Sequence, residues 1–216
     1  MKKDFSVRSF TDTEFFSGNM FVLSSSEGVI VVDPGCYPAE AREYIQSLGR
    51  VDAILLTHAH WDHIRRLLDL KADFPNAPVY LYRGQRDFLT NTELNGSAPQ
   101  KFDVIVDIDV IELEEGKIVL AGNEIDVIYT PGHTIGECMY YFPEQDILIV
   151  GDVLVREVEF GPTFRATGDA EAMKASCKKI LAYGIPDETR CCCGHGIDIT
   201  GTHLKKMFMK AEELVK

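Results

Sequence analysis

The sequence predicts a layered α/β domain in which helices cover the faces of β-sheets. Three observations lead to this fold class. Short apolar runs typical of strands occur along the whole chain, helix-type segments lie before, between and after them, and Gly, Pro and Asn turn signals separate the two kinds of segment. The length of 216 residues suits a single domain over residues 1–216 with a substantial core.

The first half of the chain alternates strands and helices. Residues 19–35 predict two strands joined by a turn at 24–28. A helix follows over 37–49, because helix-forming residues there are bounded by Pro38 and Gly49. Further along we expect a strand, a helix, a second strand and a short helix, at 51–56, 63–71, 77–82 and within 84–94.

The second half is richer in strands. Three β-type runs are separated by turn signals such as Gly122-Asn123, and they lie at 117–130, 137–143 and 146–152. A helix, a strand and a closing amphipathic helix complete the chain, at 168–184, 188–193 and 201–216.

Composition excludes several classes of partner. The formal net charge of −12 repels phosphate backbones, so nucleic acid is not an expected substrate. The longest apolar runs, such as residues 147–150, are far shorter than the roughly 18 residues of a membrane span, and no apolar stretch follows the N-terminal lysines. We therefore expect a cytoplasmic protein without a signal peptide or membrane span, acting on a small molecule.

Six cysteines are present, and three of them are adjacent at 191–193. In a cytosolic protein they are expected to be reduced thiols. Because neighbouring strand residues point to opposite faces, Cys191 and Cys193 should share one face and Cys192 the other. Small apolar strand residues are the favoured interpretation, and a thiolate site is the alternative, weakened by the absence of any CxxC spacing.

Four times an apolar strand-like run leads into a metal-capable side chain. These side chains are His58, His133, Asp152 and His195. Loops at the ends of neighbouring strands can converge on one point, which is how α/β folds build sites. Imidazole and carboxylate are ligands for zinc, manganese or iron, so the pattern predicts a metal site.

The stretch "HAHWDH" at 58–63 adds further candidate ligands. His58 and His60 are two apart and face the same way in extended backbone, while Asp62 and His63 lie at the expected helix start. Asp62 is also placed to cap that helix, and Trp61 either packs under the loop or lines the cleft. The candidate ligands are His58, His60, Asp62, His63, His133, Asp152 and His195. One tetrahedral ion cannot use so many ligands, which favours two metals that share a bridging carboxylate.

Four motifs together resemble a known family. "THAHWDH", "TPGHT", "GD" and "GHG", in this order, are similar to those of the metallo-β-lactamase superfamily, in its glyoxalase II-like (hydroxyacylglutathione hydrolase-like) branch of metallohydrolases. The resemblance covers nearly the whole chain. It implies an αββα sandwich with the metal site at one edge of the two sheets.

The resemblance also implies roles for individual residues. The first metal would be held by His58, His60 and His133, and the second by Asp62, His63 and His195. Asp152 would bridge both, and Asp33 would lie behind the ligands and support them. Two divalent ions, zinc first with iron or manganese open, would activate a water held between them for attack on a thioester or related activated ester. The carboxylates Asp62 and Asp152 are thus the candidate catalytic groups.

The chain also departs from the family. Glyoxalase II enzymes carry a C-terminal helical domain that helps bind glutathione, whereas only residues 196–216 follow His195 here, so a glutathione pocket of that kind is not expected. Pro162 and Phe164 stand where the family often has arginine and aspartate, and Arg165 is a substitute by proximity. A mononuclear iron persulfide dioxygenase-like protein, using His58, His133 and Asp152, is the alternative function. The sequence predicts no oligomeric state.

Two arginines follow the histidine cluster. Relatives commonly continue with Gly-Gly, whereas this chain has Arg65 and Arg66. One interpretation is that they are solvated helix residues on an acidic protein. The other is that one of them binds an anionic group of the substrate at the cleft mouth, because guanidinium pairs well with carboxylate or phosphate.

Overall fold

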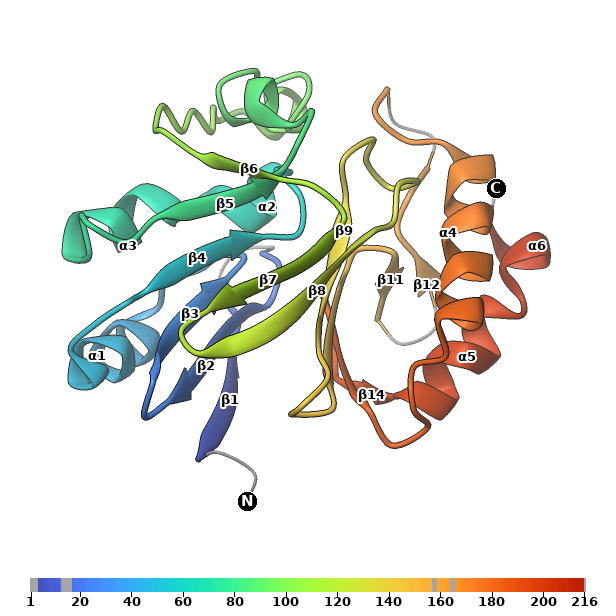
Figure 1. The fold of residues 1–216 in the computed structure, drawn as a ribbon. Coiled ribbons are helices and arrows are strands. Elements are labelled where there is room, and N and C mark those ends of the chain that lie inside the picture. Colours follow the sequence, from blue (N-terminus) through green and yellow to red (C-terminus); the bar gives the residue numbers. More distant parts are fainter. Residues whose placement is uncertain (1–3, 13–16, 157–158, 164–165, 216) are drawn as a thin grey trace. The chain divides into compact units, whose positions relative to one another are not determined.

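The computed structural model describes residues 4–12, 17–156, 159–163 and 166–215. These residues divide into two compact units, shown in Figure 1. Unit 1 consists of Met1–Leu113 and Val119–Asn123, and unit 2 of Glu114–Ile118 and Glu124–Lys216.

Unit 1 contains a six-stranded sheet. Its strand order is β1 (Phe5–Phe10), β2 (Met20–Ser25), β3 (Gly28–Val32), β4 (Ala53–Leu56), β5 (Val79–Tyr82) and β6 (Ile111–Leu113). The first three strands pair antiparallel, whereas β3 to β6 pair in parallel. Parallel neighbours need crossover connections, and helices supply them between β3 and β5.

The helices of unit 1 are short. They are α1 (Ala39–Leu48), α2 (Trp61–Ile64), α3 (Leu67–Asp73) and two 3₁₀ turns, η1 (Arg86–Leu89) and η2 (Ala98–Gln100). Ile45 of α1 and Leu70 of α3 belong to the same buried cluster as Val31, Ile54 and Leu56. Val31 alternates with Ile30 and Val32 along β3, and Ile54 and Leu56 are spaced two apart, so the helices pack on one face of the sheet.

Unit 2 contains the second six-stranded sheet, except residues 119–120 and 123, and its described residues include three helices. Its strand order is β14 (Ile199–Thr200), β13 (Arg190–Cys193), β10 (Ile147–Gly151), β9 (Cys138–Phe142), β8 (Asn123–Tyr129) and β7 (Gly116–Leu120), and a small sheet pairs β11 (Leu154–Val155) with β12 (Glu159–Phe160). β10 and β13 pair in parallel, which brings their C-terminal ends to the same edge. Buried residues of α4 (Ala170–Tyr183), α5 (Gly201–Phe208) and α6 (Ala211–Leu214) form one core with β9, β10 and β13.

Most predicted elements are confirmed, and two helices are corrections. The predicted helix over 63–71 is two helices, because the Arg66 N–H donates to the Pro34 carbonyl 2.9 Å away. The predicted closing helix over 201–216 is also two helices, because the Lys210 N–H donates to the Met207 carbonyl in a tight turn. The segment within 84–94 contains a 3₁₀ turn, η1. Strands β1, β6, β11, β12 and β14 were not predicted.

The triple cysteine lies on β13 as predicted. Cys191 and Cys193 pack in the core that includes α4 and α5, Cys192 is buried outside that cluster, and all six thiols are unbridged. Burial raises the pKa of Cys191 to about 12. The Cys191 thiol is therefore neutral at physiological pH and behaves as a small apolar residue. Within the part of the chain that the structure describes, every helix is too short or too polar to cross a membrane.

Candidate metal centre

Seven buried side chains belong to groups of residues that can hold a metal ion. Unit 1 carries His58, His60, Asp62 and His63, and unit 2 carries His133, Asp152 and His195. Each has a relative exposure of at most 7%. Buried imidazoles and carboxylates need defined partners. The partners found within each unit therefore show how the candidate ligands of that unit are held.

In unit 1 the candidate ligands follow the buried strand β4. A bend at Thr57 separates β4 from His58, His60 is in extended backbone, and α2 begins at Trp61, directly after His60. The ring centroids of His58 and His60 are 4.9 Å apart, and those of His58 and His63 are 4.1 Å apart. The spacing of two places the first pair together, and the first turn of α2 brings His63 back toward His58.

The buried carboxylate of Asp33 lies behind these histidines and contacts several groups. One carboxylate oxygen accepts from the Thr57 N–H at 2.8 Å, and the other lies 2.6 Å from the Thr57 Oγ1 and 3.0 Å from the His63 Nδ1. Asp33 adopts a φ of 51°, a left-handed conformation that Asp tolerates better than most residues. The backbone at the end of β3 is thus shaped to direct this carboxylate toward the ligand loop.

These contacts determine the histidine tautomers. A carboxylate oxygen only accepts, so the Thr57 hydroxyl donates to Asp33, and the His63 Nδ1 carries a proton. The His58 Nδ1 lies 3.1 Å from the Thr57 Oγ1, whose single hydrogen is already committed, so this Nδ1 also donates. In the neutral form of both rings, Nε2 is then the unprotonated nitrogen. A histidine that donates through one nitrogen and ligates through the other is the usual arrangement in metal sites.

Two glycines let neighbouring backbone approach the ligand turn closely. The Gly18 N–H donates to the Asp62 carbonyl at 2.9 Å, and a Cβ on Gly18 would lie 2.8 Å from the His63 ring. A Cβ on Gly35 would lie 1.6 Å from the Asp62 carbonyl oxygen. The chain on either side of β2 and β3 therefore packs directly against α2 and limits how the ligand turn can move.

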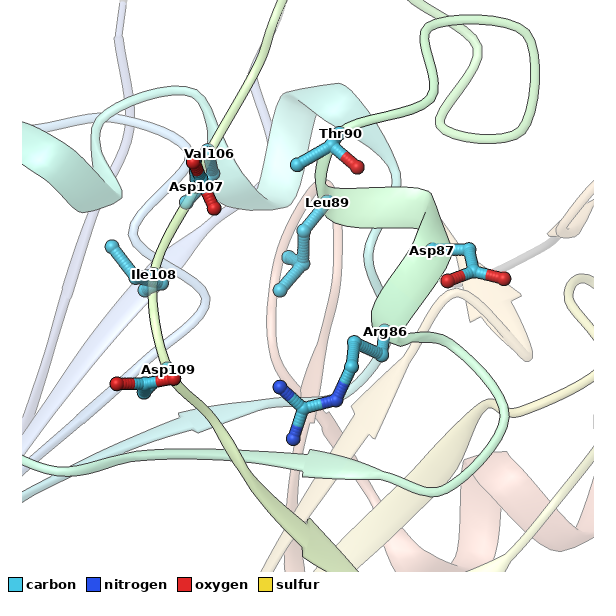
Figure 2. Close-up of a pocket in the computed structure, with 8 residues that line it drawn as sticks. All are labelled: Arg86, Asp87, Leu89, Thr90, Val106, Asp107, Ile108 and Asp109. Carbon is cyan, nitrogen blue, oxygen red and sulfur yellow. The ribbon is translucent and has the colours of Figure 1, made fainter.

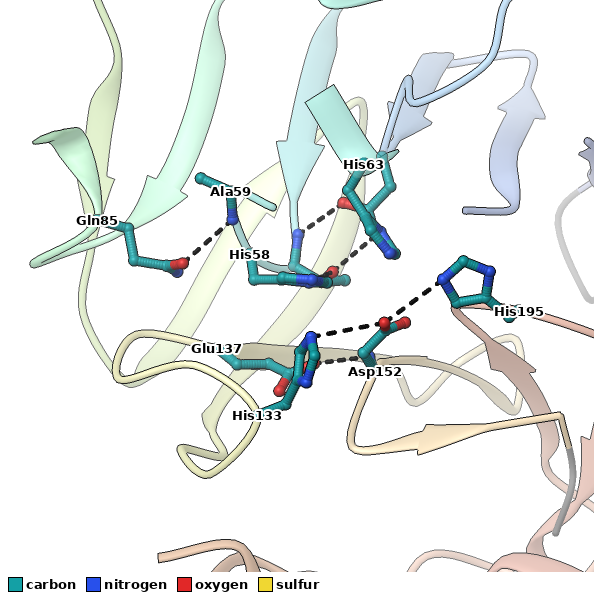
Figure 3. Close-up of polar contacts among 10 residues, drawn as sticks. His58, Ala59, His63, Gln85, His133, Glu137, Asp152 and His195 are labelled. Atoms are coloured by element: carbon teal, nitrogen blue, oxygen red, sulfur yellow. Dashed lines mark hydrogen bonds and ion pairs between the residues drawn. The ribbon is translucent and has the colours of Figure 1, made fainter. Parts of the chain in front are cut away.

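In unit 2 the candidate ligands follow three strands of one sheet. His133 comes after β8, Asp152 follows β10 and His195 follows β13. One Asp152 carboxylate oxygen lies 3.6 Å from the His133 Nε2 and 3.4 Å from the His195 Nε2 (Figure 3). The His133 Nδ1 donates to the Pro162 carbonyl at 3.0 Å, because a carbonyl only accepts. In the neutral His133 ring, Nε2 is therefore the unprotonated nitrogen, and it faces the Asp152 carboxylate.

Backbone contacts join the Asp152 turn to the His195 turn. The Gly194 N–H donates to the Gly151 carbonyl at 2.8 Å, and the Arg156 N–H donates to the His195 carbonyl at 3.1 Å. A Cβ on Gly194 would lie 2.0 Å from an Asp152 carboxylate oxygen. Glycine at position 194 is thus required for the two turns to come this close.

Two buried side chains that sequence reasoning missed hold the backbone of the ligand loops. In unit 1 the Gln85 side-chain oxygen accepts from the Ala59 N–H at 3.1 Å, and in unit 2 the Glu137 Oε1 accepts from the Asp152 N–H at 2.6 Å (Figure 3). Both acceptors are fully buried. The only signal in the sequence was a polar residue next to an apolar strand.

The other sequence candidates lie beside the ligand turn of unit 1 or outside the described residues. Trp61 is 5% exposed and packs edge-to-face on Phe102 at 5.1 Å, as the packing interpretation predicts. The Arg65 guanidinium lies 5.4 Å from the centre of the same Phe102 ring, and Arg66 pairs with Asp69 at 3.1 Å. Arg165 falls outside the described residues.

A separate pocket of about 440 Å³ in unit 1 is shown in Figure 2. It is lined by Arg86, Asp87, Leu89, Thr90, Val106, Asp107, Ile108 and Asp109. None of the candidate ligands lines it, and its only cation, Arg86, donates to the Val110 carbonyl at 2.8 Å. With three aspartates around it, this pocket does not suit an anionic substrate.

Two proteins of related sequence support the interpretation of the site. "Probable metallo-hydrolase YqgX" of Bacillus subtilis (strain 168) is 32% identical over 181 residues, covering 82% of this chain and 84% of that protein. A "Hydroxyacylglutathione hydrolase" of Yersinia pestis (strain Pestoides F) is 29% identical, covering 85% of this chain and 63% of that protein. The narrower glyoxalase II-like part of the resemblance stays a prediction.

Solved structures establish the fold class. The BLEG-1 B3 metallo-beta-lactamase superposes with a TM-score of 0.81 at 30% identity, covering 94% of this chain and 96% of its own. TTHA1623 in a di-iron-bound form superposes with a TM-score of 0.75 at 31% identity, covering 90% and 93%. The predicted α/β fold of the metallo-β-lactamase type is confirmed. The family model of the metallo-beta-lactamase superfamily matches residues 13–195, and the chain belongs to this superfamily.

Proposed function

We propose that the protein is a binuclear metal-dependent hydrolase that cleaves a thioester or a related activated ester. One observation carries this proposal: in each unit, buried imidazoles are hydrogen-bonded through Nδ1, so that Nε2 is the nitrogen left to bind a metal. Such orientation is characteristic of metal ligands, which usually donate through one ring nitrogen and bind the metal through the other.

The donor set fits two divalent ions. In this proposal His58, His60 and His133 hold one ion, Asp62, His63 and His195 hold the other, and Asp152 contacts both. Neutral imidazole and carboxylate suit zinc, iron or manganese, and the absence of a thiolate ligand agrees with the neutral, buried cysteines. Two metals in such a site supply an activated water at neutral pH and a Lewis acid for the acyl oxygen.

The residues of the chain would orient and hold these ligands. Asp33 keeps His63 in one tautomer directly and His58 through the Thr57 hydroxyl. The Pro162 carbonyl does the same for His133. Because all three histidines are preset before a metal binds, little side-chain entropy remains to be lost when the site fills.

A thioester is the proposed substrate class because of its leaving group. Thiolates leave readily at neutral pH, so hydrolysis needs no strong general acid. The similarity to a protein named for hydroxyacylglutathione, an acyl thioester, supports this choice. We further propose a small-molecule substrate in the cytoplasm, since the net charge of −12 disfavours nucleic acid and anionic membrane surfaces.

The metal pair is supported by TTHA1623, which was crystallised in a di-iron-bound form. Zinc remains our first choice for this chain and iron the second. Elemental analysis of the purified protein, combined with oxygen uptake, tests the proposal: two metals and thioester cleavage without oxygen consumption are expected. One iron per chain with oxygen consumption would instead establish the persulfide dioxygenase-like activity.

Two ligand variants and one control test the site. His133→Ala and Asp152→Ala should lose bound metal and at least about 100-fold of thioesterase activity. His203→Ala is the matched control, because this sixth histidine lies on α5, where its N–H donates to the Thr200 hydroxyl. Full activity in either ligand variant would show that the ligand assignment is wrong.

A further inference from the structure

Glu137 occupies an unusual position for an acidic residue. It directly precedes β9, it is fully buried, and its Oε1 accepts from the Asp152 N–H at 2.6 Å. Its backbone carbonyl accepts from the Thr130 N–H at 2.9 Å. Burying a carboxylate is costly, so such a residue normally serves a specific purpose.

These two contacts join two ligand-bearing segments. The bond between Glu137 and Thr130 closes the loop 131–136 that carries His133, and the bond to the Asp152 N–H fixes the turn after β10. His133 and Asp152 face each other across 3.6 Å. A movement of the Glu137 side chain would therefore be transmitted to the distance between these two ligands.

The Asp152 N–H needs such an acceptor because the strand ladder is irregular there. β10 ends at Gly151, where φ is 63°, and the register with β13 shifts between Ile149 and Gly151. A bulge of this kind redirects the following side chain and takes its N–H out of the ladder. In unit 1 the Ala59 N–H likewise donates to a side chain, and its acceptor is the neutral amide oxygen of Gln85.

We propose that Glu137 is a positioning residue that sets Asp152 for metal binding through the Asp152 N–H. The proposal rests on the proposed metal site. Gln85 shows that a neutral oxygen is sufficient to accept such a backbone N–H. The required properties at position 137 are therefore an acceptor oxygen and a side chain long enough to bring it to the Asp152 N–H. Glutamine should therefore replace Glu137, whereas a side chain that lacks the oxygen or is shorter should not.

The experiment loads the full chain with Co²⁺, whose visible absorption reports ligand geometry, and measures Co²⁺ affinity by competition with a chelator. Glu137→Met keeps the side-chain volume without an acceptor and should weaken binding about 10- to 100-fold, with an altered spectrum. Glu137→Asp keeps the charge but shortens the reach, so it should resemble the methionine variant. Glu137→Gln should keep the wild-type spectrum and an affinity within about threefold of wild type.

Glu144→Met is the matched control, because Glu144 is exposed in the turn between β9 and β10. Circular dichroism and thermal melting establish that each variant is folded. If Glu137→Met fails to fold, Glu137→Asp against Glu137→Gln decides the question. Wild-type affinity and spectrum in Glu137→Asp, or equal losses in Glu137→Asp and Glu137→Gln, would overturn the proposal. Wild-type protein that binds no Co²⁺ would instead refute the proposed metal site itself.

Discussion

Replacing Asp33 with asparagine is a sharp test of how the ligand loop of unit 1 is held. Asparagine has nearly the same shape and tolerates the φ of 51° at this position, so the backbone should be retained. The amide nitrogen, however, must face either the Thr57 N–H or the pair formed by the Thr57 hydroxyl and the His63 Nδ1. At least one of the three hydrogen bonds to the carboxylate is lost in each orientation.

The magnitude follows from this count. A hydrogen bond to a charged group contributes about 1.5–3 kcal/mol, so the cheaper orientation should lower the free energy of unfolding by about that amount. In the other orientation the amide also favours the His63 tautomer with its proton on Nε2, which cannot ligate a metal. Metal affinity should therefore fall about 10- to 100-fold as well.

Urea unfolding of the metal-depleted protein, followed by circular dichroism, measures the first effect, and chelator competition measures the second. Asp69→Asn is the matched control, because this exposed aspartate on α3 pairs with the partly exposed Arg66 and is not one of the residues in contact with Asp33. If Asp33→Asn matches wild type within about 0.5 kcal/mol and about twofold in affinity, the carboxylate does not hold the histidines as argued.

Three further predictions concern a glycine, the thiols and the arginines. Gly194→Ala should weaken metal binding at least about tenfold in a chelator titration, since its Cβ would lie 2.0 Å from an Asp152 carboxylate oxygen. Gly49→Ala is the control: its Cβ would lie in open space, so it should lower stability and leave metal binding unchanged. Burial raises the pKa of Cys36 to about 11 and of Cys191 to about 12, from an ordinary value near 9.0. As the pH rises, thiols of the unfolded chain therefore lose their protons before those of the folded chain. The free energy of unfolding, measured by urea titration, should fall between about pH 9 and pH 12. A variant in which all six cysteines are replaced by serine or alanine should show a smaller fall. Arg65→Ala should raise KM for acidic thioesters at unchanged metal content. Arg66→Ala should leave KM unchanged, because the Arg66 guanidinium pairs with Asp69. Wild-type KM values in both variants would favour the interpretation of two solvated helix residues.

The sequence predicted the strands that lead into the metal-capable residues because both depend on local patterns. An apolar run that stops at histidine or aspartate is visible without the fold, and parallel pairing brings β10 and β13 to the same edge. The acceptors behind the ligands were not predictable in this way. Gln85 reaches a backbone group 26 residues away and Glu137 one 15 residues away, and no pattern in their own segments indicates those contacts.

The helix predicted over 63–71 was wrong for a related reason, and this error explains why arginines can follow the ligand cluster. The Pro34 carbonyl takes the Arg66 N–H, so α2 ends after a single turn and a new helix begins at Leu67. The close backbone approach to this turn comes from Gly18 and Gly35, on segments outside α2. Positions 65 and 66 are therefore not where tight packing is required, and long side chains there leave the ligand turn undisturbed. It follows that exchanging both arginines for glycine should change metal affinity little, while any substitution at Gly35 should abolish the site.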